Sequence, residues 1–304
     1  MPYNLVTVLG PTATGKTLLA AHVASKLNSC VISADSRQVY RDMNIGTGKD
    51  LQDYTVDGKL IPVHLIDICE AGETYNLFEY LQDFNEIFLQ LEKQNQIPVL
   101  CGGSGLYIEA VLKQYNLVSV PVNNKLRKEL SKKTDPELVN LLISFKKLHN
   151  TTDIITRKRL IRAIEIEQYQ KEHPIKKNPG PAINSLLTGI KFERDELKQR
   201  ITKRLNARLK NGLIEEVEQL LKSGITPENL IYYGLEYKFI TQYLTGKISY
   251  DEMHTLLNIA IHQFSKRQMT WFRKMEREGF HIHWIDGNIP LEMKIETVLK
   301  LIYL

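Results

Sequence analysis

The feature that most constrains this chain is a loop of eight residues close to its N-terminus. The loop matches the pattern Gly-x4-Gly-Lys-[Ser/Thr] in full and consists of Gly10, Pro11, Thr12, Ala13, Thr14, Gly15, Lys16 and Thr17. An apolar run over residues 5–9 precedes the loop, and a helical stretch over residues 18–27 follows it. Because the pattern requires that strand and that helix, we predict a phosphate-binding loop at the start of an α/β fold.

The residue types in this loop suit a diphosphate or a longer polyphosphate. Its glycines let backbone N–H groups turn inward around phosphate oxygens, and the N-terminus of the following helix adds partial positive charge. Lys16 supplies a point charge, and the Thr17 hydroxyl is a ligand for Mg²⁺. The loop therefore predicts binding of Mg²⁺ together with a diphosphate compound or a nucleotide such as ATP.

Short apolar runs alternate with helical stretches in the first third of the chain, which is typical of a parallel sheet. We expect strands over residues 5–9, 31–34, 63–66, 97–101, 186–190 and 280–285. The strand pattern is absent between residues 123 and 185, and single long helices are expected over 195–222 and 250–278. The prediction is a P-loop NTPase-like parallel-sheet core, residues 1–122 and 186–304, interrupted by an all-helical insertion, residues 123–185.

Composition and charge narrow the class of protein. Apolar residues make up 43% and charged residues 25%, which excludes a disordered chain, and no apolar run is long enough to span a bilayer. The three cysteines form no Cys-x-x-Cys pair, so we expect a protein of the reducing cytoplasm. Acidic residues outnumber basic ones in residues 1–112, whereas basic residues prevail by about two to one in 113–190. This asymmetry predicts that a polyanion such as a nucleic acid binds the later part.

Four further residues are candidates for the same site. Asp35 follows the second expected strand, and ligands of open α/β sheets lie beyond the carboxyl ends of strands, so Asp35 is placed to act as a base. Asp67 follows a later apolar run and is placed to hold Mg²⁺ through water. Arg200 and Arg204 lie four residues apart on an expected helix and could clamp a diphosphate. The structural alternatives are a turn aspartate for Asp35 and Asp67 and a solvated basic helix face for the arginines.

Several blocks of the sequence together resemble the tRNA dimethylallyltransferases, also called tRNA isopentenyltransferases. They extend over nearly the whole chain, at residues 10–17, 32–49, 64–67, 102–107, 159–165, 212–217 and 266–273. The blocks Asp-Ser-Arg-Gln-Val-Tyr at 35–40 and Lys-Arg-Gln-Met-Thr-Trp-Phe-Arg at 266–273 are specific, because P-loop kinases generally lack them. The sequence lacks the zinc finger of many eukaryotic members, so the resemblance is to the bacterial type.

The resemblance implies transfer of a dimethylallyl group from dimethylallyl pyrophosphate to the exocyclic amine of the adenosine 3′-adjacent to the anticodon of tRNA, with release of pyrophosphate. It makes Asp35 the base that takes the amine proton, while Lys16, Thr17 and Arg204 stabilise the leaving pyrophosphate with Mg²⁺. The implied contacts to the anticodon stem-loop are Asp35, Ser36, Arg37, Gln38, Ser104, Arg127, Lys158, Arg159, Leu160, Ile161 and Arg162. We expect a monomer with no membrane partner.

The sequence also departs from the family pattern. Ser104 stands where Thr is usual and keeps the hydroxyl. The pattern Gly-Thr-Ala-Lys-Pro reads Gly-Thr-Gly-Lys-Asp here, with Gly48 and Asp50 as the replacements. A Gly-Tyr-Lys-Glu region is replaced by residues 233–238, which include Glu236, and His262 ends an Ile-His pair that stands where Thr-Arg is usual.

Three other functions remain open at this point. An adenylate isopentenyltransferase would use free AMP or ATP as acceptor, although a free nucleotide needs no long basic platform. A small-molecule kinase could be built on the same P-loop core. A non-catalytic RNA-binding module would keep the loop as scaffold alone, against which the retained Lys16, Thr17 and Asp35 argue.

Overall fold

A computed structural model of the chain describes residues 2–147, 152–173 and 180–303. The chain divides into two compact units, of which the larger comprises Met1–Tyr115 with Pro181–Leu304 and the smaller comprises Asn116–Gly180. The smaller unit begins and ends a few residues earlier than the insertion expected from the sequence. No helix within the described ranges is long and apolar enough to cross a bilayer.

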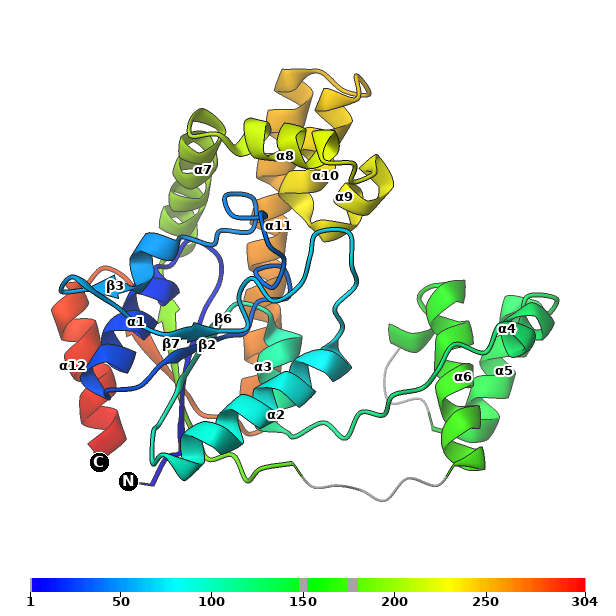
Figure 1. Ribbon diagram of the computed structural model, residues 1–304, viewed down its shortest axis with the longest axis horizontal. Helices are drawn as coiled ribbons and strands as arrows, with labels where there is room; N and C mark the ends of the chain where they lie inside the picture. The colour runs from blue at the N-terminus through cyan, green and yellow to red at the C-terminus, as the bar shows by residue number, and fades with distance from the viewer. Residues whose placement is uncertain (1, 148–151, 174–179, 304) are drawn as a thin grey trace. The chain divides into compact units, whose positions relative to one another are not determined.

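A six-stranded sheet in which every neighbouring pair is parallel forms the centre of the larger unit (Figure 1). Its strands are β1 (Leu5–Leu9), β2 (Val31–Ser33), β5 (Val63–His64), β6 (Val99–Gly102), β7 (Ser185–Lys191) and β8 (Ile282–Asp286). Their order across the sheet is β5-β2-β6-β1-β7-β8. Strand β7, which follows the insertion, pairs with β1 from Leu5↔Ser185 to Leu9↔Gly189. The predicted parallel α/β core is therefore confirmed, and segments on both sides of the insertion complete one sheet.

Helices cover both faces of this sheet because its strands are apolar on both sides. Along β1, Val6 and Val8 point into one core and Leu5 and Leu9 into the other. The first core is closed by α1 (Lys16–Lys26) and α12 (Leu291–Tyr303). The second is closed by α2 (Leu77–Lys93), α3 (Gly105–Leu112) and the second half of α11 (Tyr250–Arg277). A small hairpin of β3 (Thr55–Val56) and β4 (Lys59–Leu60), next to the 3-10 helix η1 (Leu51–Tyr54), was not expected.

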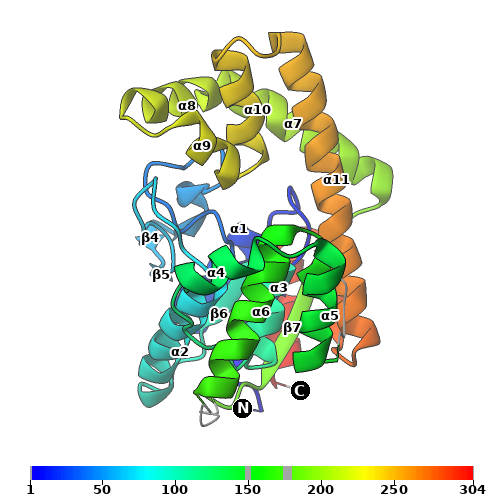
Figure 2. The same cartoon turned by 90° about the vertical axis from the view of Figure 1, so that its right-hand side faces the viewer.

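A helical cluster surrounds the first half of α11 (Figures 1 and 2). It consists of α7 (Arg194–Lys210), α8 (Leu213–Lys222), α9 (Pro227–Tyr233) and α10 (Leu235–Leu244). The prediction of one helix over residues 195–222 was wrong, because the chain breaks at Gly212, whose φ of 99° lies in the left-handed region that glycine adopts freely. The short helices α9 and α10 were not expected.

The long helix α11 joins this cluster to the sheet. Its 28 residues correspond to about 42 Å at a rise of 1.5 Å per residue. Leu257 and Ile261 in its first half pack into the helical cluster, whereas Phe272 and Met275 in its second half pack on the sheet. Gln268 lies between these two apolar segments and is therefore held at the junction of sheet and cluster.

The smaller unit is helical throughout its described elements. These are α4 (Asn124–Leu130), α5 (Asp135–Phe145), the 3-10 helix η2 (Thr152–Ile154) and α6 (Arg157–Glu172). A small apolar core joins them and includes Leu138, Leu142 and Leu160. Beside this core lies the carboxylate of Glu165, whose side chain is 1% exposed and which forms ion pairs with Arg127 and Arg162. Three charged side chains of the insertion are thus part of its internal structure.

Candidate active site

A cavity of about 370 Å³ opens in the larger unit where the central strands end. The P-loop, the turns after β2 and β6, and residues of α7, α10 and α11 line it. The residues predicted for the site that the structure brings together here are Thr12, Ala13, Gly15, Lys16, Thr17, Asp35, Ser36, Arg37, Gln38, Ser104 and Arg204. Segments far apart in the sequence therefore meet at one cavity beside the phosphate-binding loop, as expected for the carboxyl edge of an α/β sheet.

The P-loop keeps its shape through local backbone geometry. Ala13 and Gly15 have φ values of 66° and 80°, so the chain curls tightly before α1 begins at Lys16. A Cβ on Gly10 would lie 2.8 Å from the carbonyl oxygen of Ile190, so the close approach of the loop to β7 requires glycine. Thr14 is buried, and its hydroxyl donates to the carbonyl of Pro11 at 2.9 Å. Gly10, Pro11 and Thr14 thus support the loop from behind the cavity.

Side chains from α7 and α11 fasten the loop from outside. The Thr12 N–H donates to Oε1 of Gln268 at 2.9 Å, and Nε2 of Gln268 donates to the Gly103 carbonyl at 2.9 Å. Arg204 donates to the Thr12 hydroxyl, and Nε of Arg200 donates to the Ala13 carbonyl at 3.1 Å. Sequence reasoning gave Gln268 no role. The only signal was its place in the specific block at 266–273, because its partner Thr12 is 256 residues away.

The sequence left two alternatives for Asp35, a base at the site and a turn aspartate, and the structure is compatible with both. Its Oδ1 accepts from the Arg37 N–H at 2.9 Å, which forms the turn after β2. The same side chain lines the cavity opposite Lys16 and is only partly exposed. Burial raises the pKa of Asp35, while the N–H of Arg37 and the charge of Lys16 oppose the change. A carboxylate with a raised pKa is a stronger base, so this position suits proton removal.

The cations of the cavity are desolvated. Burial lowers the pKa of Lys16 to about 8, and the neighbouring Arg204 contributes in the same direction. Burial also lowers the pKa of Arg204 to about 10. Lys16 donates to the Pro11 carbonyl at 2.9 Å, and Arg204 reaches the same loop. Two cations beside one glycine loop favour an anionic ligand with several oxygens.

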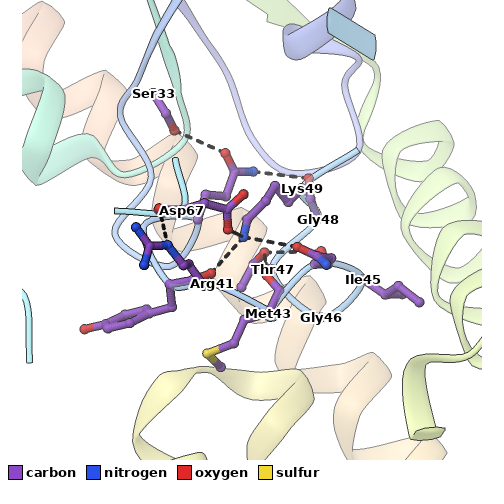
Figure 3. A network of polar contacts seen from close by, with 12 residues as sticks. Ser33, Arg41, Met43, Ile45, Gly46, Thr47, Gly48, Lys49 and Asp67 are labelled. Carbon is purple, nitrogen blue, oxygen red and sulfur yellow. Dashed lines mark hydrogen bonds and ion pairs between the residues drawn. The ribbon is translucent and has the colours of Figure 1, made fainter. Parts of the chain in front are cut away.

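Asp67 is not at this cavity, which corrects the expectation that it faces the loop. Its carboxylate pairs with Lys49, whose ammonium group is buried and also donates to the Tyr40 carbonyl at 2.7 Å and to Oδ1 of Asn44 at 3.2 Å (Figure 3). The reason is local. Leu65 and Asp67 have φ values of 61° and 54°, so the chain turns sharply after β5 ends. Asp67 therefore orders the loop of residues 43–49, and its water-mediated contact with Mg²⁺ stays a prediction.

The remaining donor atoms still fit Mg²⁺. In the part of the chain that the structure describes, no group of three or more His, Cys, Asp or Glu side chains could hold a metal by itself. Mg²⁺ prefers oxygen ligands and is commonly held by few protein groups together with phosphate oxygens and water. The Thr17 hydroxyl lines the cavity beside Lys16 and meets that requirement. A metal here would thus depend on the diphosphate for its other ligands.

The predicted RNA contacts of the smaller unit differ in accessibility. Lys158 and Arg159 are exposed in the first turn of α6. Arg127 and Arg162 instead pair with the buried Glu165, at 2.8 Å for Arg127. Leu160 is 2% exposed and Ile161 packs against the same apolar core. The side chain of Leu160 is therefore closed to a ligand, and any contact it makes must come from its backbone.

Comparisons with known proteins agree with one another. Residues 38–275 match the family described as IPP transferase, and residues 3–59 match the description Isopentenyl transferase. The chain is 55% identical to a tRNA dimethylallyltransferase 2 of Bacteroides fragilis, over 97% of each chain. It is 54% identical to a tRNA dimethylallyltransferase 1 of Parabacteroides distasonis, over 99% of this chain and 98% of that protein. The crystal structure of a tRNA isopentenylpyrophosphate transferase from Bacillus halodurans is 30% identical with a TM-score of 0.72, over 98% and 95% of the two chains.

The lowered pKa of Lys16 leads to a prediction about anion binding. Above pH 8 the free amine is mostly neutral, whereas a bound diphosphate favours the charged form, so binding should take up a proton and weaken as the pH rises from 8 to 10. Titration calorimetry of methyl diphosphate at pH 9, in buffers of different ionisation enthalpy, measures that uptake. The ligand's own last ionisation lies near pH 6, at about the value of other phosphate esters.

The matched control is Lys16→Arg, which keeps a charge that does not titrate in this range. This variant should bind the anion at pH 9 without proton uptake. Equal uptake by the variant and the unchanged protein would show that another group is responsible.

Proposed function

The chain belongs to the IPP transferase family, and from this premise we propose that it transfers a dimethylallyl group from dimethylallyl pyrophosphate to the exocyclic amine of the adenosine 3′-adjacent to the anticodon in tRNA. The observation that carries the proposal is one cavity that joins Lys16 and Thr17 of the P-loop to Asp35 and Arg204. This supports a diphosphate site and a base, Asp35, that share one reaction space.

The donor would be held by its diphosphate. The loop supplies backbone N–H groups and the N-terminus of α1, while Lys16 and Arg204 supply positive charge. Mg²⁺, when bound through Thr17, would neutralise charge that develops on the diphosphate. Since Lys16 and Arg204 are already desolvated, they need little reorganisation as the leaving group gains charge.

The transfer replaces a carbon–oxygen bond with a carbon–nitrogen bond and moves one proton. The exocyclic nitrogen of adenine attacks the first carbon of the dimethylallyl group, and the bond from that carbon to the diphosphate oxygen breaks. Pyrophosphate leaves with the electron pair, and the amine proton passes to the carboxylate of Asp35. The amine is a weak nucleophile because its lone pair is delocalised into the ring, so removal of its proton assists the attack.

The acceptor would be RNA rather than a free nucleotide. The target base belongs to a stacked loop and must leave the stack before its amine can enter a cavity, at a cost of a few kcal/mol. Contacts to the flanking RNA must offset this cost. Lys158 and Arg159 of the smaller unit are exposed and basic, and Ser36, Arg37 and Ser104 line the cavity itself. A free nucleotide would use none of the basic surface of the insertion.

The direct test is mass spectrometry of tRNA nucleosides after incubation with labelled dimethylallyl pyrophosphate and Mg²⁺. We expect one dimethylallyl group on the adenosine 3′-adjacent to the anticodon, with pyrophosphate as the second product and no requirement for ATP. Modification of free AMP at a comparable rate would contradict the choice of acceptor. Stoichiometric ADP release from ATP would favour the kinase instead.

The role of Asp35 can be separated from its role in the turn. Asp35→Asn keeps Oδ1 as acceptor for the Arg37 N–H but removes the base, so kcat should fall by about 10²–10⁴-fold while tRNA binds as before. The matched control is Asp53→Asn, which changes another carboxylate of the same cavity. Its kcat should change by less than about fivefold. An unchanged kcat in Asp35→Asn would leave Asp35 with a structural role alone.

The RNA contact of the insertion can be tested through salt dependence. Arg159→Ala should weaken tRNA binding and flatten the slope of log K against log salt by a little under one unit, because one phosphate contact is lost. Lys171→Ala, at the other end of α6 and also exposed, is the control and should change the slope little. Arg162 is unsuitable because its loss would strip a partner from the buried Glu165. Equal slopes for the unsubstituted protein, Arg159→Ala and Lys171→Ala would show that the RNA binds elsewhere.

A further inference from the structure

Three positions at which the sequence departs from the family pattern surround one side chain, that of Arg208 on α7. Gly48 and Asp50 belong to the loop that follows β2, and Glu236 lies in the first turn of α10. All four residues line the cavity of the phosphate-binding loop. Changes that are scattered through the sequence therefore meet at one guanidinium group.

Gly48 makes room for this group. A Cβ on Gly48 would lie 2.8 Å from Nη2 and 3.1 Å from Nη1 of Arg208, so the alanine of the family pattern would collide with the guanidinium as it is placed here. The φ of Gly48 is 71°, which also favours glycine. The carbonyl of Gly48 accepts from Nε2 of Gln38 at 3.1 Å, which fixes the loop against the arginine.

One carboxylate, Asp50, holds Arg208 without using all of its donors, and a second, Glu236, lies near enough to interact through its charge. Nη2 lies 3.2 Å from each carboxylate oxygen of Asp50. Burial raises the pKa of the Glu236 carboxyl, and the nearby charges of Arg208 and Arg204 oppose that rise. The Arg208 side chain is 11% exposed, yet among the described residues no acceptor lies within hydrogen-bond distance of its Nε and Nη1. Neither nitrogen is one of the fully buried, unpartnered polar atoms of the described residues, so both are open to a ligand that enters the cavity.

The position of Arg208 indicates which ligand would accept from its free donors. Arg200, Arg204 and Arg208 are spaced by four residues and share one face of α7. Arg200 contacts the Ala13 carbonyl and Arg204 the Thr12 hydroxyl, so this row of arginines starts at the phosphate-binding loop. Arg208 lies one turn further along, at about 6 Å, beside the same cavity.

We propose that Arg208 is a further phosphate-binding residue of this enzyme and donates hydrogen bonds to the diphosphate of the prenyl donor from the guanidinium N–H groups that Asp50 does not use. The guanidinium keeps its charge at any ordinary pH and hydrogen-bonds phosphate oxygens well. Asp50 acts as a positioning residue, because it holds Nη2 and leaves Nε and Nη1, which point in different directions, to separate oxygens of the diphosphate. This assignment rests on the proposed function, in which the phosphate-binding loop holds the diphosphate of the prenyl donor.

The test compares Arg208→Met with Asp50→Asn. The probe is dimethylallyl S-thiolodiphosphate, a donor analogue that resists transfer, titrated into the full chain with an anticodon stem-loop present. Arg208→Met should raise the Kd of the analogue by at least about tenfold, because a charge-assisted contact is lost. Asp50→Asn should leave that Kd unchanged or lower it, because the Asn Oδ1 can still accept from Nη2 and position Arg208 while a competing negative charge is removed. Arg208→Lys keeps the charge without the fork and should lie between the unchanged protein and Arg208→Met.

Two outcomes overturn the assignment. If both variants weaken the analogue equally and lower the melting temperature equally, Arg208 and Asp50 form a structural pair. If Arg208→Met leaves analogue binding intact but flattens the salt dependence of tRNA binding, the phosphate belongs to the RNA. Product formation by the unchanged chain is measured in parallel. If the unsubstituted protein forms no product, the proposed function itself is overturned. If it forms product and either outcome above is seen, only the role of Arg208 is overturned.

Discussion

A single buried amide holds the active-site cavity together. Gln268 is 6% exposed, and its Oε1 and Nε2 bond to the Thr12 N–H and the Gly103 carbonyl, each at 2.9 Å. These two bonds connect α11 to the phosphate-binding loop after β1 and to the turn after β6. A buried amide with both ends paired fixes three segments at once, whereas an unpaired one would be costly. Gly103 leaves the space for this side chain, because a Cβ there would lie 2.4 Å from Nε2 of Gln268.

The loop that carries Gly48 and Asp50 depends on buried charges. The carboxylate of Glu216 on α8 accepts from the N–H groups of Asn44, Ile45 and Gly46 and from the Tyr237 hydroxyl. Lys49 is 4% exposed and is paired on the other side of the same loop. Loss of Asp67 would leave the buried ammonium of Lys49 without its charge partner, and loss of Glu216 would leave three backbone N–H groups without their acceptor. These contacts therefore keep a loop without regular secondary structure in one conformation. Its rigidity allows Arg208 and Gln38 to lie at fixed places beside the cavity.

The cavity concentrates cations that have lost much of their hydration. Burial lowers the pKa of both Lys16 and Arg204, and the Asp35 carboxylate near Lys16 is shifted upward by the same cause. A diphosphate would relieve the repulsion between Lys16 and Arg204, while the raised pKa of Asp35 suits the role of base proposed for it. The same desolvation therefore favours binding of the anionic leaving group and strengthens the base.

Local sequence determined the strands, most helices and the P-loop, because strand and helix periodicity and the loop's glycines act over a few residues. It also indicated Lys16, Thr17 and Asp35, since the carboxyl ends of parallel strands meet at one edge. It did not determine the break at Gly212, because a glycine within a helical pattern can continue the helix or end it. The partners of Asp67, Arg162 and Gln268 were decided by the tertiary structure alone. A charged or amide side chain has the same sequence signature whether it faces a ligand or a buried partner, and only the packing of distant segments selects one of them.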